Sequence, residues 1–199
     1  RRSIFRPVTT HALQTLFYRV KTRKKLPFSV RIVQVSDLHV NERLGMAYFQ
    51  KALNQVRALQ ADILVWTGDY VSDSSKIGLL RDLLQDMPAR YGSYAILGNH
   101  DYWSDAMDVT SALQASGFHV LSRQSARVEL DTETALVITG CEMPWSKIPC
   151  QIGSPGAGEI SIVLSHSADS IPSVCKAGAD LVFAVHYHAV QVQRPLIGP

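Results

Sequence analysis

The chain has 199 residues, of which 46% are hydrophobic and 19% charged, values that fit one globular domain with a substantial core. This composition excludes a disordered or fibrous protein, and no apolar run reaches the roughly 18 residues that a membrane-spanning helix needs. The net charge of +3 is uneven, because the residues before Asp37 include nine Lys or Arg and no acid.

The first predicted element is a basic amphipathic arm over residues 1–27, separate from the domain that follows. Its apolar side chains have the i, i+3, i+4, i+7 spacing of one helical face, at Leu13, Leu16, Phe17 and Val20. Five bases follow between Arg19 and Lys25, and Pro27 ends the predicted helix. Such a helix lies flat in an anionic membrane interface, or it packs on the domain with its charges in water. The sequence leaves both interpretations open.

Residues 28–199 form one predicted domain in which strand-like and helix-like patterns alternate. Short hydrophobic runs predict strands over residues 30–36, 63–67, 94–97, 128–130, 135–139, 160–164 and 181–185, with one more near 191–192. Helical spacing predicts helices over residues 46–59, 77–84 and 107–115, and residues 140–158 are predicted to form a long loop. This alternation predicts a layered α/β domain.

Polar clusters follow directly on five of the predicted strands. They are Asp37-Leu38-His39, Gly68-Asp69, Gly98-Asn99-His100-Asp101, His166 and His186-Tyr187-His188. Ligand sites of α/β sheets lie beyond the carboxyl ends of the strands, so we expect these side chains to converge. Each cluster alone is commonplace, and a lone histidine such as His166 is more often structural. Five in order, each ending a strand, favour a shared site.

The residue types and spacing indicate a site for divalent metal ions. Side chains at i and i+2 of an extended segment point the same way, so Asp37 with His39, and His186 with His188, each present two ligands together. Oxygen and nitrogen donors of this kind suit manganese, iron or zinc. A carboxylate has two oxygens and can bridge two ions, a role that we assign to Asp69.

The strings SDLH, TGDY and GNHD make this pattern resemble the calcineurin-like metallophosphoesterase superfamily, whose signature reads DxH, GD, GNH[DE], H and GHxH. The resemblance covers residues 30–194 and implies the metallophosphoesterase fold, a layered β-sandwich flanked by helices. It is strongest to the membrane-associated branch. That branch contains single-domain phosphodiesterases and a UDP-2,3-diacylglucosamine pyrophosphohydrolase of lipid A synthesis.

The resemblance also implies a role for each site residue. One metal ion would bind Asp37, His39, Asp69 and His188, and the other would bind Asp69, Asn99, His166 and His186. Manganese is the expected metal, and the two ions would activate a water for attack on phosphorus. His100 would act on the leaving group, with Asp101 orienting its imidazole. The chain departs from the family at Val185 and at Ala189-Val190, where glycines are expected.

The expected activity is therefore hydrolysis of a phosphodiester or pyrophosphate bond, in a lipid- or nucleotide-linked substrate such as UDP-2,3-diacylglucosamine. One alternative is a broad phosphodiesterase or phosphatase on soluble substrates, and another is a non-catalytic metal-binding scaffold. The basic arm favours an anionic membrane surface as partner. Nucleic acid is not expected, because the bases concentrate in the arm and not around the motifs.

Three widely spaced cysteines, Cys141, Cys150 and Cys175, cannot all pair within one chain. We interpret them as reduced thiols and expect a cytoplasmic protein, held peripherally at the cytoplasmic membrane face. The chain opens with Arg1 instead of Met, and relatives extend beyond the position of Pro199. We therefore expect residues to be missing at one or both ends.

Overall fold

The computed structural model describes residues 13, 15–22, 24, 26–147 and 149–186, and in them two four-stranded sheets. The first sheet is parallel throughout and has the order β1 (Ile32–Val35), β2 (Ile63–Trp66), β3 (Ser93–Ala95), β4 (Phe118–Val120). The second has the order β5 (Ser125–Glu129), β6 (Ala135–Cys141), β7 (Glu159–Ser165), β8 (Leu181–Ala184). Its strands are parallel except for β5, which runs antiparallel to β6.

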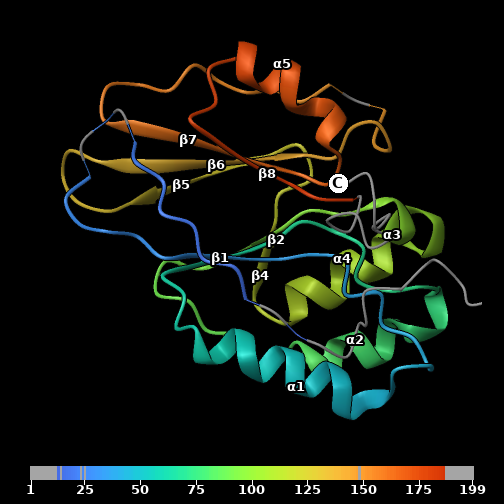
Figure 1. Ribbon diagram of the computed structural model, residues 1–199. Helices are drawn as coiled ribbons and strands as arrows, with labels where there is room; N and C mark the ends of the chain where they lie inside the picture. The colour runs from blue at the N-terminus through green and yellow to red at the C-terminus, as the bar shows by residue number, and fades with distance from the viewer. Residues whose placement is uncertain (1–12, 14, 23, 25, 148, 187–199) are drawn as a thin grey trace, which may run out of the picture.

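Helices cover the outer faces of both sheets, so the domain has four layers (Figure 1). Helices α1 (Gly45–Ala58), α2 (Ile77–Leu83) and α4 (Ala106–Ala115) lie on the β1–β4 sheet. Helix α5 (Ile171–Lys176) lies on the β5–β8 sheet, and the short helix α3 (Asn99–Ser104) follows β3 at the site edge. Two single 3₁₀ turns, Ser74–Lys76 and Ala168–Ser170, precede α2 and α5. The predicted β-sandwich flanked by helices is confirmed.

Strand β2 shows how one sequence run supplies two cores. Its four side chains are all buried, and alternate residues of a strand face opposite sides of the sheet. Leu64 and Trp66 pack with the helices of the first sheet, whereas Ile63 and Val65 pack against residues of the second sheet. A strand that is apolar on both faces therefore marks the sheet that lies between two other layers.

Most predicted elements are present with boundaries shifted by a few residues, and three short elements were missed: β4, α3 and α5. The helix predicted through the arm is wrong for the part that the structure describes, because residue 13 and residues 15–22 have no helical conformation. Tertiary contacts outweigh weak helical spacing there. The strand predicted near 191–192 lies outside the described residues.

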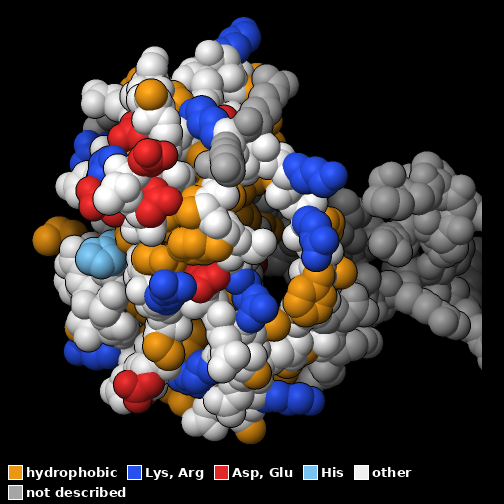
Figure 2. All heavy atoms as spheres, turned by 90° about the vertical axis from the view of Figure 1, so that its left-hand side faces the viewer, with side chains coloured by type: hydrophobic (Ala, Val, Ile, Leu, Met, Phe, Trp, Pro, Cys, Tyr) orange, Lys and Arg blue, Asp and Glu red, His pale blue; other side chains and the backbone are white. Residues whose placement is uncertain are grey.

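Residues 15–22 and 24 instead run over the domain and contact both of its halves (Figure 1). The Gln55 amide of α1 donates to Thr15 Oγ1 at 2.6 Å, and the Lys24 ammonium lies 3.2 Å from Asp180 Oδ2. Between these contacts the apolar side chains of Leu16, Phe17, Tyr18 and Val20 are 61–81% exposed. The face in Figure 2 shows Lys and Arg side chains among hydrophobic ones, with several acidic side chains at the upper left and others near the centre and the lower left. In the part of the chain described, no helix is long and apolar enough to span a bilayer.

Candidate metal centre

The loops that follow β1, β2, β3, β7 and β8 meet at one edge of the two sheets, as the strand order requires. Each loop carries one of the polar clusters found in the sequence. The structure brings together Asp37, His39, Asp69, Asn99, His100, Asp101, His166 and His186. His188 lies outside the described residues, so its predicted role as a ligand stays a prediction.

Asp69 is the centre of this cluster. Its carboxylate is 1% exposed, and its Oδ2 lies 3.5 Å from His39 Nε2 and 3.3 Å from His166 Nε2. Two groups of side chains have ligand atoms within 4.8 Å of one another: Asp69 with His39 and His100, and Asp69 with His166 and His186. Because Asp69 belongs to both groups, its position fits a carboxylate shared by two ions.

Charge and hydrogen bonding keep Asp69 ionised despite its burial. Burial by itself raises the pKa of this carboxyl, but His166, the backbone N–H of His100 and His39 lower it to below its ordinary value. In the same pair, burial lowers the pKa of His166 while Asp69 and the Thr67 carbonyl raise it above its usual value. A stable carboxylate at this point supplies the negative charge that a cation site requires.

His166 is held with a defined ring nitrogen facing the cluster. Its Nδ1 lies 2.6 Å from the carbonyl oxygen of Thr67, which can only accept, so Nδ1 carries the proton. In the neutral ring Nε2 then has the lone pair, and it lies 3.1 Å from Asn99 Oδ1 and 3.1 Å from His186 Nδ1. A second partner that fixes the tautomer is typical of metal-binding histidines. The donor set therefore fits divalent ions.

The segment with Asp37 and His39 differs from the extended conformation that we expected. Strand β1 ends at Val35, and both residues have left-handed backbones, with φ of 52° and 43°. The N–H of Asp37 donates to the Gly68 carbonyl, and that of His39 donates to the Asp69 carbonyl, both at 3.0 Å. Hydrogen bonds to the neighbouring loop, and not the alternation of a strand, thus bring these side chains together.

His100 lies beside the cluster at the start of α3. Its backbone N–H donates to Asp69 Oδ1 at 2.9 Å, and its ring meets that of His39 edge-on, with centroids 4.6 Å apart. The ring is partly open to solvent, unlike the fully buried His166. This position suits a group that reaches a substrate from the side of Asp69 and His39.

Asp101 contacts the backbone of the site loops. Its Oδ2 accepts from the N–H groups of Asp69 and Gly98, at 2.8 and 2.9 Å, and its Oδ1 accepts from Tyr70 at 2.9 Å. Burial raises the pKa of Asp101 to about 7, although these three donors act in the opposite direction. We expected Asp101 to orient the His100 imidazole. Instead, the described contacts fix the loops that carry Asp69 and His100.

Three polar contacts of Glu142 were not anticipated from the sequence. The buried Glu142 accepts hydrogen bonds from the Leu97 N–H at 2.7 Å, the Tyr102 hydroxyl at 2.7 Å and the Ser122 hydroxyl at 3.1 Å. These contacts connect the end of β6 to both sides of the Asn99–Asp101 turn. Glu142 directly follows a strand, which is the signal that identified the other clusters, and it could have been found in the same way.

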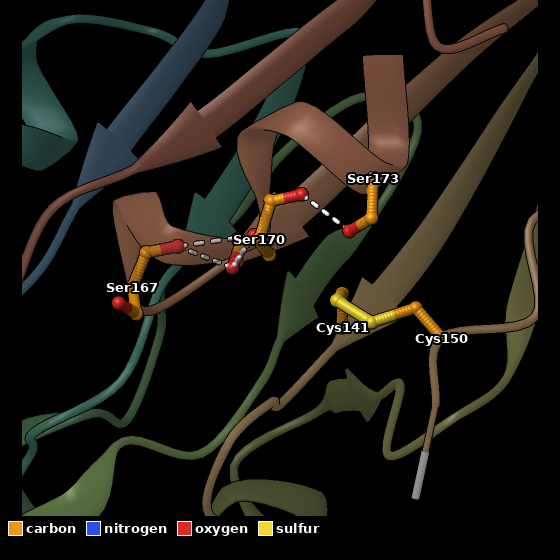
Figure 3. Close-up of a disulfide and its surroundings, with 6 residues drawn as sticks. Cys141, Cys150, Ser167, Ser170 and Ser173 are labelled. Carbon is orange, nitrogen blue, oxygen red and sulfur yellow. Dashed lines mark hydrogen bonds between the residues drawn. A yellow bond between two sulfur atoms is a disulfide. The ribbon is translucent and has the colours of Figure 1, made fainter. Parts of the chain in front are cut away.

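A disulfide joins Cys141 at the end of β6 to Cys150, with Cα atoms 5.1 Å apart (Figure 3). The interpretation of these two residues as reduced thiols is therefore wrong, whereas Cys175 is a free, exposed cysteine. The loop that the disulfide closes carries Trp145, whose half-buried ring lies 5.2 Å from the His166 ring and 5.1 Å from the His186 ring. The position of Trp145 beside these two histidines was also not predicted, because the loop sequence contains no motif that indicates it.

Serine side chains fix the turn that follows His166 (Figure 3). The hydroxyls of Ser165 and Ser170 both donate to the Ser167 carbonyl, at 2.8 and 3.0 Å, and Ser173 donates to the Ser170 carbonyl at 2.7 Å. These bonds satisfy carbonyl groups at the start of α5 and hold the backbone on which His166 lies.

The departure from the family signature at Val185 is accommodated by the local backbone. The left-handed conformation occurs one residue later, at His186, where φ is 64°, and Val185 is not among the residues with positive φ. The Val185 N–H donates to the His166 carbonyl at 3.2 Å. A β-branched residue therefore fits at 185, and its neighbour His186 still reaches the cluster.

Comparisons with known proteins show which sequences this chain resembles. The sequence profile of the family described as Calcineurin-like phosphoesterase matches residues 30–189. Over 78 residues the chain is 42% identical to a UDP-2,3-diacylglucosamine pyrophosphatase, LpxG, of Chlamydia muridarum, an alignment covering 37% of this chain and 23% of that protein. A transmembrane protein with metallophosphoesterase domain of Danio rerio is 33% identical, over 53% of this chain and 25% of its own.

A longer alignment links the chain to an uncharacterized metallophosphoesterase of Bacillus subtilis, YkuE, with 24% identity over 85% of this chain and 62% of the relative. The chain thus spans less than two thirds of the length of each of these three relatives.

Proposed function

The chain belongs to the calcineurin-like phosphoesterase family, and from this membership we propose that it hydrolyses a phosphodiester or pyrophosphate bond with two divalent metal ions. The observation that supports the proposal is the position of Asp69, which lies between His39 on one side and His166 and His186 on the other and belongs to both groups of side chains that could hold an ion. When bound, a metal pair neutralises phosphoryl oxygens and lowers the pKa of water toward about 7. Manganese is the metal that we propose.

The residues around Asp69 would have different roles in such a site. Asp37, His39 and His188 would complete one metal site with Asp69, and Asn99, His166 and His186 would complete the other. The burial of Asp69 and His166 excludes water from their ligand atoms, which strengthens their interaction with a cation. His100 is less buried, so its imidazole is placed to meet the substrate and to donate a proton to the leaving oxygen.

For the substrate we propose a pyrophosphate or phosphodiester within a lipid- or nucleotide-linked compound such as UDP-2,3-diacylglucosamine. The printed name of the Chlamydia relative supports this choice, over an alignment that covers 37% of the chain. A broad activity on soluble esters is the main alternative. A scaffold without activity is less well supported, because the described ligands and His100 are all present in one cluster.

The proposal is tested by metal reconstitution and a substrate panel. The full chain, stripped of metal and reloaded with Mn²⁺, is expected to hydrolyse bis(p-nitrophenyl) phosphate and to release UMP from a UDP-linked acylated sugar. Asp69→Asn is the control, since it keeps the size of the side chain but removes its charge. Preference for small soluble esters would favour the alternative activity. A chain that binds Mn²⁺ and cleaves no ester would refute hydrolysis.

We further propose that residues 1–27 bind the anionic cytoplasmic face of a membrane, and that the protein is cytoplasmic and peripheral. This proposal rests on the arm alone, because the Cys141–Cys150 disulfide removes the support that reduced thiols would have given. Support comes from the exposed side chains of Leu16, Phe17, Tyr18 and Val20, next to Arg19 and Lys21. Apolar side chains enter the interface, and each nearby base contributes roughly 1 kcal/mol of attraction to anionic lipid. The contacts at Thr15 and Lys24 hold this segment against the domain.

Sedimentation with vesicles containing phosphatidylserine tests the membrane proposal. Arg19→Gln with Lys21→Gln is expected to weaken binding by about tenfold or more. Lys51→Gln with Arg81→Gln, which removes two exposed charges from α1 and α2, is the matched control and should have a smaller effect. If the two double variants lose vesicle binding equally, net charge, and not the arm, governs binding.

A further inference from the structure

Two large apolar side chains are exposed on the two helices that carry and follow His100, and one of them, Trp103, contacts the His100 ring. Trp103 on α3 is 69% exposed, and Met107 on α4 is 81% exposed. Outside residues 13–27, the described chain exposes only two other large hydrophobic side chains, Phe28 and Ile171, and those by 37% and 38%. Trp103 and Met107 are thus the main apolar surface that the domain itself presents to solvent.

Trp103 lies at the exposed C-terminal end of α3, close to His100. The buried residues of this helix, Asn99 and Asp101, are in its first turn, and the Tyr102 hydroxyl is bound to Glu142. The ring centroid of Trp103 lies 5.0 Å from that of His100. The next ring inward is His39, 4.6 Å from His100 and part of the metal centre. Three rings therefore lead from the metal ligands out to solvent.

The charges around these two residues restrict what they can bind. Residues 99–109 contain no Lys or Arg, and Asp105 and Asp108 are the acids nearest to Met107 in the chain. The Asp105 carboxylate caps α4 by accepting from the N–H groups of Met107 and Asp108, at 3.1 and 3.0 Å. Residues 99–109 therefore offer an anionic headgroup or nucleic acid no basic side chain, and Arg123, whose charge acts on Tyr102, comes from outside this stretch. A neutral apolar group is attracted, because it covers the indole and the thioether.

We propose that Trp103, together with Met107, binds a hydrocarbon group of the substrate that lies next to His100. This inference rests on the proposed phosphoesterase function and refines it. It assigns the substrate to phosphoesters in which an acyl or alkyl chain is close to the scissile phosphorus. The phosphorus itself would be held on the metal ligands, and the chain would leave the site over the indole.

Two esters with the same leaving group test this role: methyl p-nitrophenyl phosphate and octyl p-nitrophenyl phosphate, below the concentration at which the octyl ester aggregates. In the Mn²⁺-loaded full chain the octyl ester should have a KM lower by about tenfold, the effect of burying about two methylenes. Trp103→Ala should bring the ratio of the two KM values close to one. Trp103→Phe should restore most of the preference, and Met107→Ala should reduce it in part.

Calorimetry with octylphosphonate and methylphosphonate gives the same comparison without turnover. Ile171→Ala, which removes an exposed hydrophobic side chain on α5, is the matched control and should keep the preference. Hydrolysis with equal KM values for both esters in the unmodified protein, or a preference that survives Trp103→Ala, would overturn this inference alone. Failure to hydrolyse either ester, together with failure to release UMP from the UDP-linked acylated sugar, would overturn the proposed function and this inference with it.

Discussion

The backbone N–H of His100 donates a 2.9 Å hydrogen bond to Oδ1 of Asp69, so the turn that carries His100 is fixed directly to the central carboxylate of the site. Asp101 strengthens this link, since its carboxylate accepts from the N–H groups of both Asp69 and Gly98. The position of the proposed proton donor is therefore set relative to the metal ligands by the backbone. A change in His100 itself need not disturb Asp69.

His100→Ala is expected to keep its metal content and to lose activity. General acid catalysis contributes about 10²–10⁴-fold, so turnover of an unactivated diester should fall by that order. The loss should shrink for a p-nitrophenyl ester, whose leaving group needs no proton. Elemental analysis and rates on both substrates provide the measurements. A variant depleted of one ion would instead show that His100 is a ligand.

Removal of the shared carboxylate should affect both metal sites. Asp69→Ala is expected to lower total bound metal more than Asn99→Ala does, because Asn99, whose Oδ1 lies 3.1 Å from His166 Nε2, would serve only the site of His166. Metal analysis of the two variants, purified alike, makes the comparison. Equal metal content in both variants would rule out Asp69 as the bridge.

Gly68→Ala is expected to destabilise the protein strongly. Gly68 has φ of +96°, and a Cβ there would lie 2.4 Å from the backbone nitrogen of Gly98. The left-handed conformation alone costs about 1–3 kcal/mol, and the contact with backbone adds to it. Gly78→Ala in α2 is the control, since nothing lies within 4 Å of its Cβ and helix propensity favours Ala by about 1 kcal/mol. Urea unfolding should show changes of opposite sign.

Glu142→Ala should reduce the free energy of unfolding by about 2–4 kcal/mol, because the buried N–H of Leu97 and the Tyr102 hydroxyl both lose their acceptor. Glu142→Gln keeps an oxygen that can accept from Leu97 and should cost about half as much. Tyr102→Phe removes one contact only and should be the mildest change. If all three variants unfold at the same urea concentration as the unmodified protein, these bonds contribute nothing to stability.

The disulfide between Cys141 and Cys150 determines how many thiols of the denatured chain can react. Without reductant, the denatured chain should contain one titratable thiol, that of Cys175, and after reduction it should contain three. Closing a loop of about ten residues also stabilises a fold by about 2–3 kcal/mol, so reduction should lower the melting temperature. Three thiols before reduction would show that Cys141 and Cys150 are not joined.

The fold and much of the site were predictable from the sequence for a physical reason. Buried strands such as β2 are apolar on both faces, and the polar residue that ends each strand interrupts that pattern sharply. Short elements were not predictable: α3 contains Asn, Asp and Ser and forms because Asp101 binds the N–H of Gly98 at its start. The pairing of Cys141 with Cys150 depends on distance in space, which spacing along the chain does not give.

The role of Asp101 shows the same limit. Its place in the motif gives its neighbours in sequence, but its partners Asp69 and Tyr70 are about thirty residues away and belong to another loop. The N-terminal arm is the reverse case. Its apolar spacing is clear, but contacts with Gln55 and Asp180 decide its conformation, and no local pattern records them.

Because the site residues have left-handed backbones, substitutions there that raise thermal stability would lower activity. In the described chain eight non-glycine residues have positive φ, and four of them are the site residues Asp37, His39, Asp69 and His186. Glycine would relax the backbone at each position, so a screen that rewards heat resistance alone would select it there. The enriched variants would be more stable to heat but inactive. A library for improving this protein should therefore hold these four positions constant and vary the helices that cover the outer faces of the sheets.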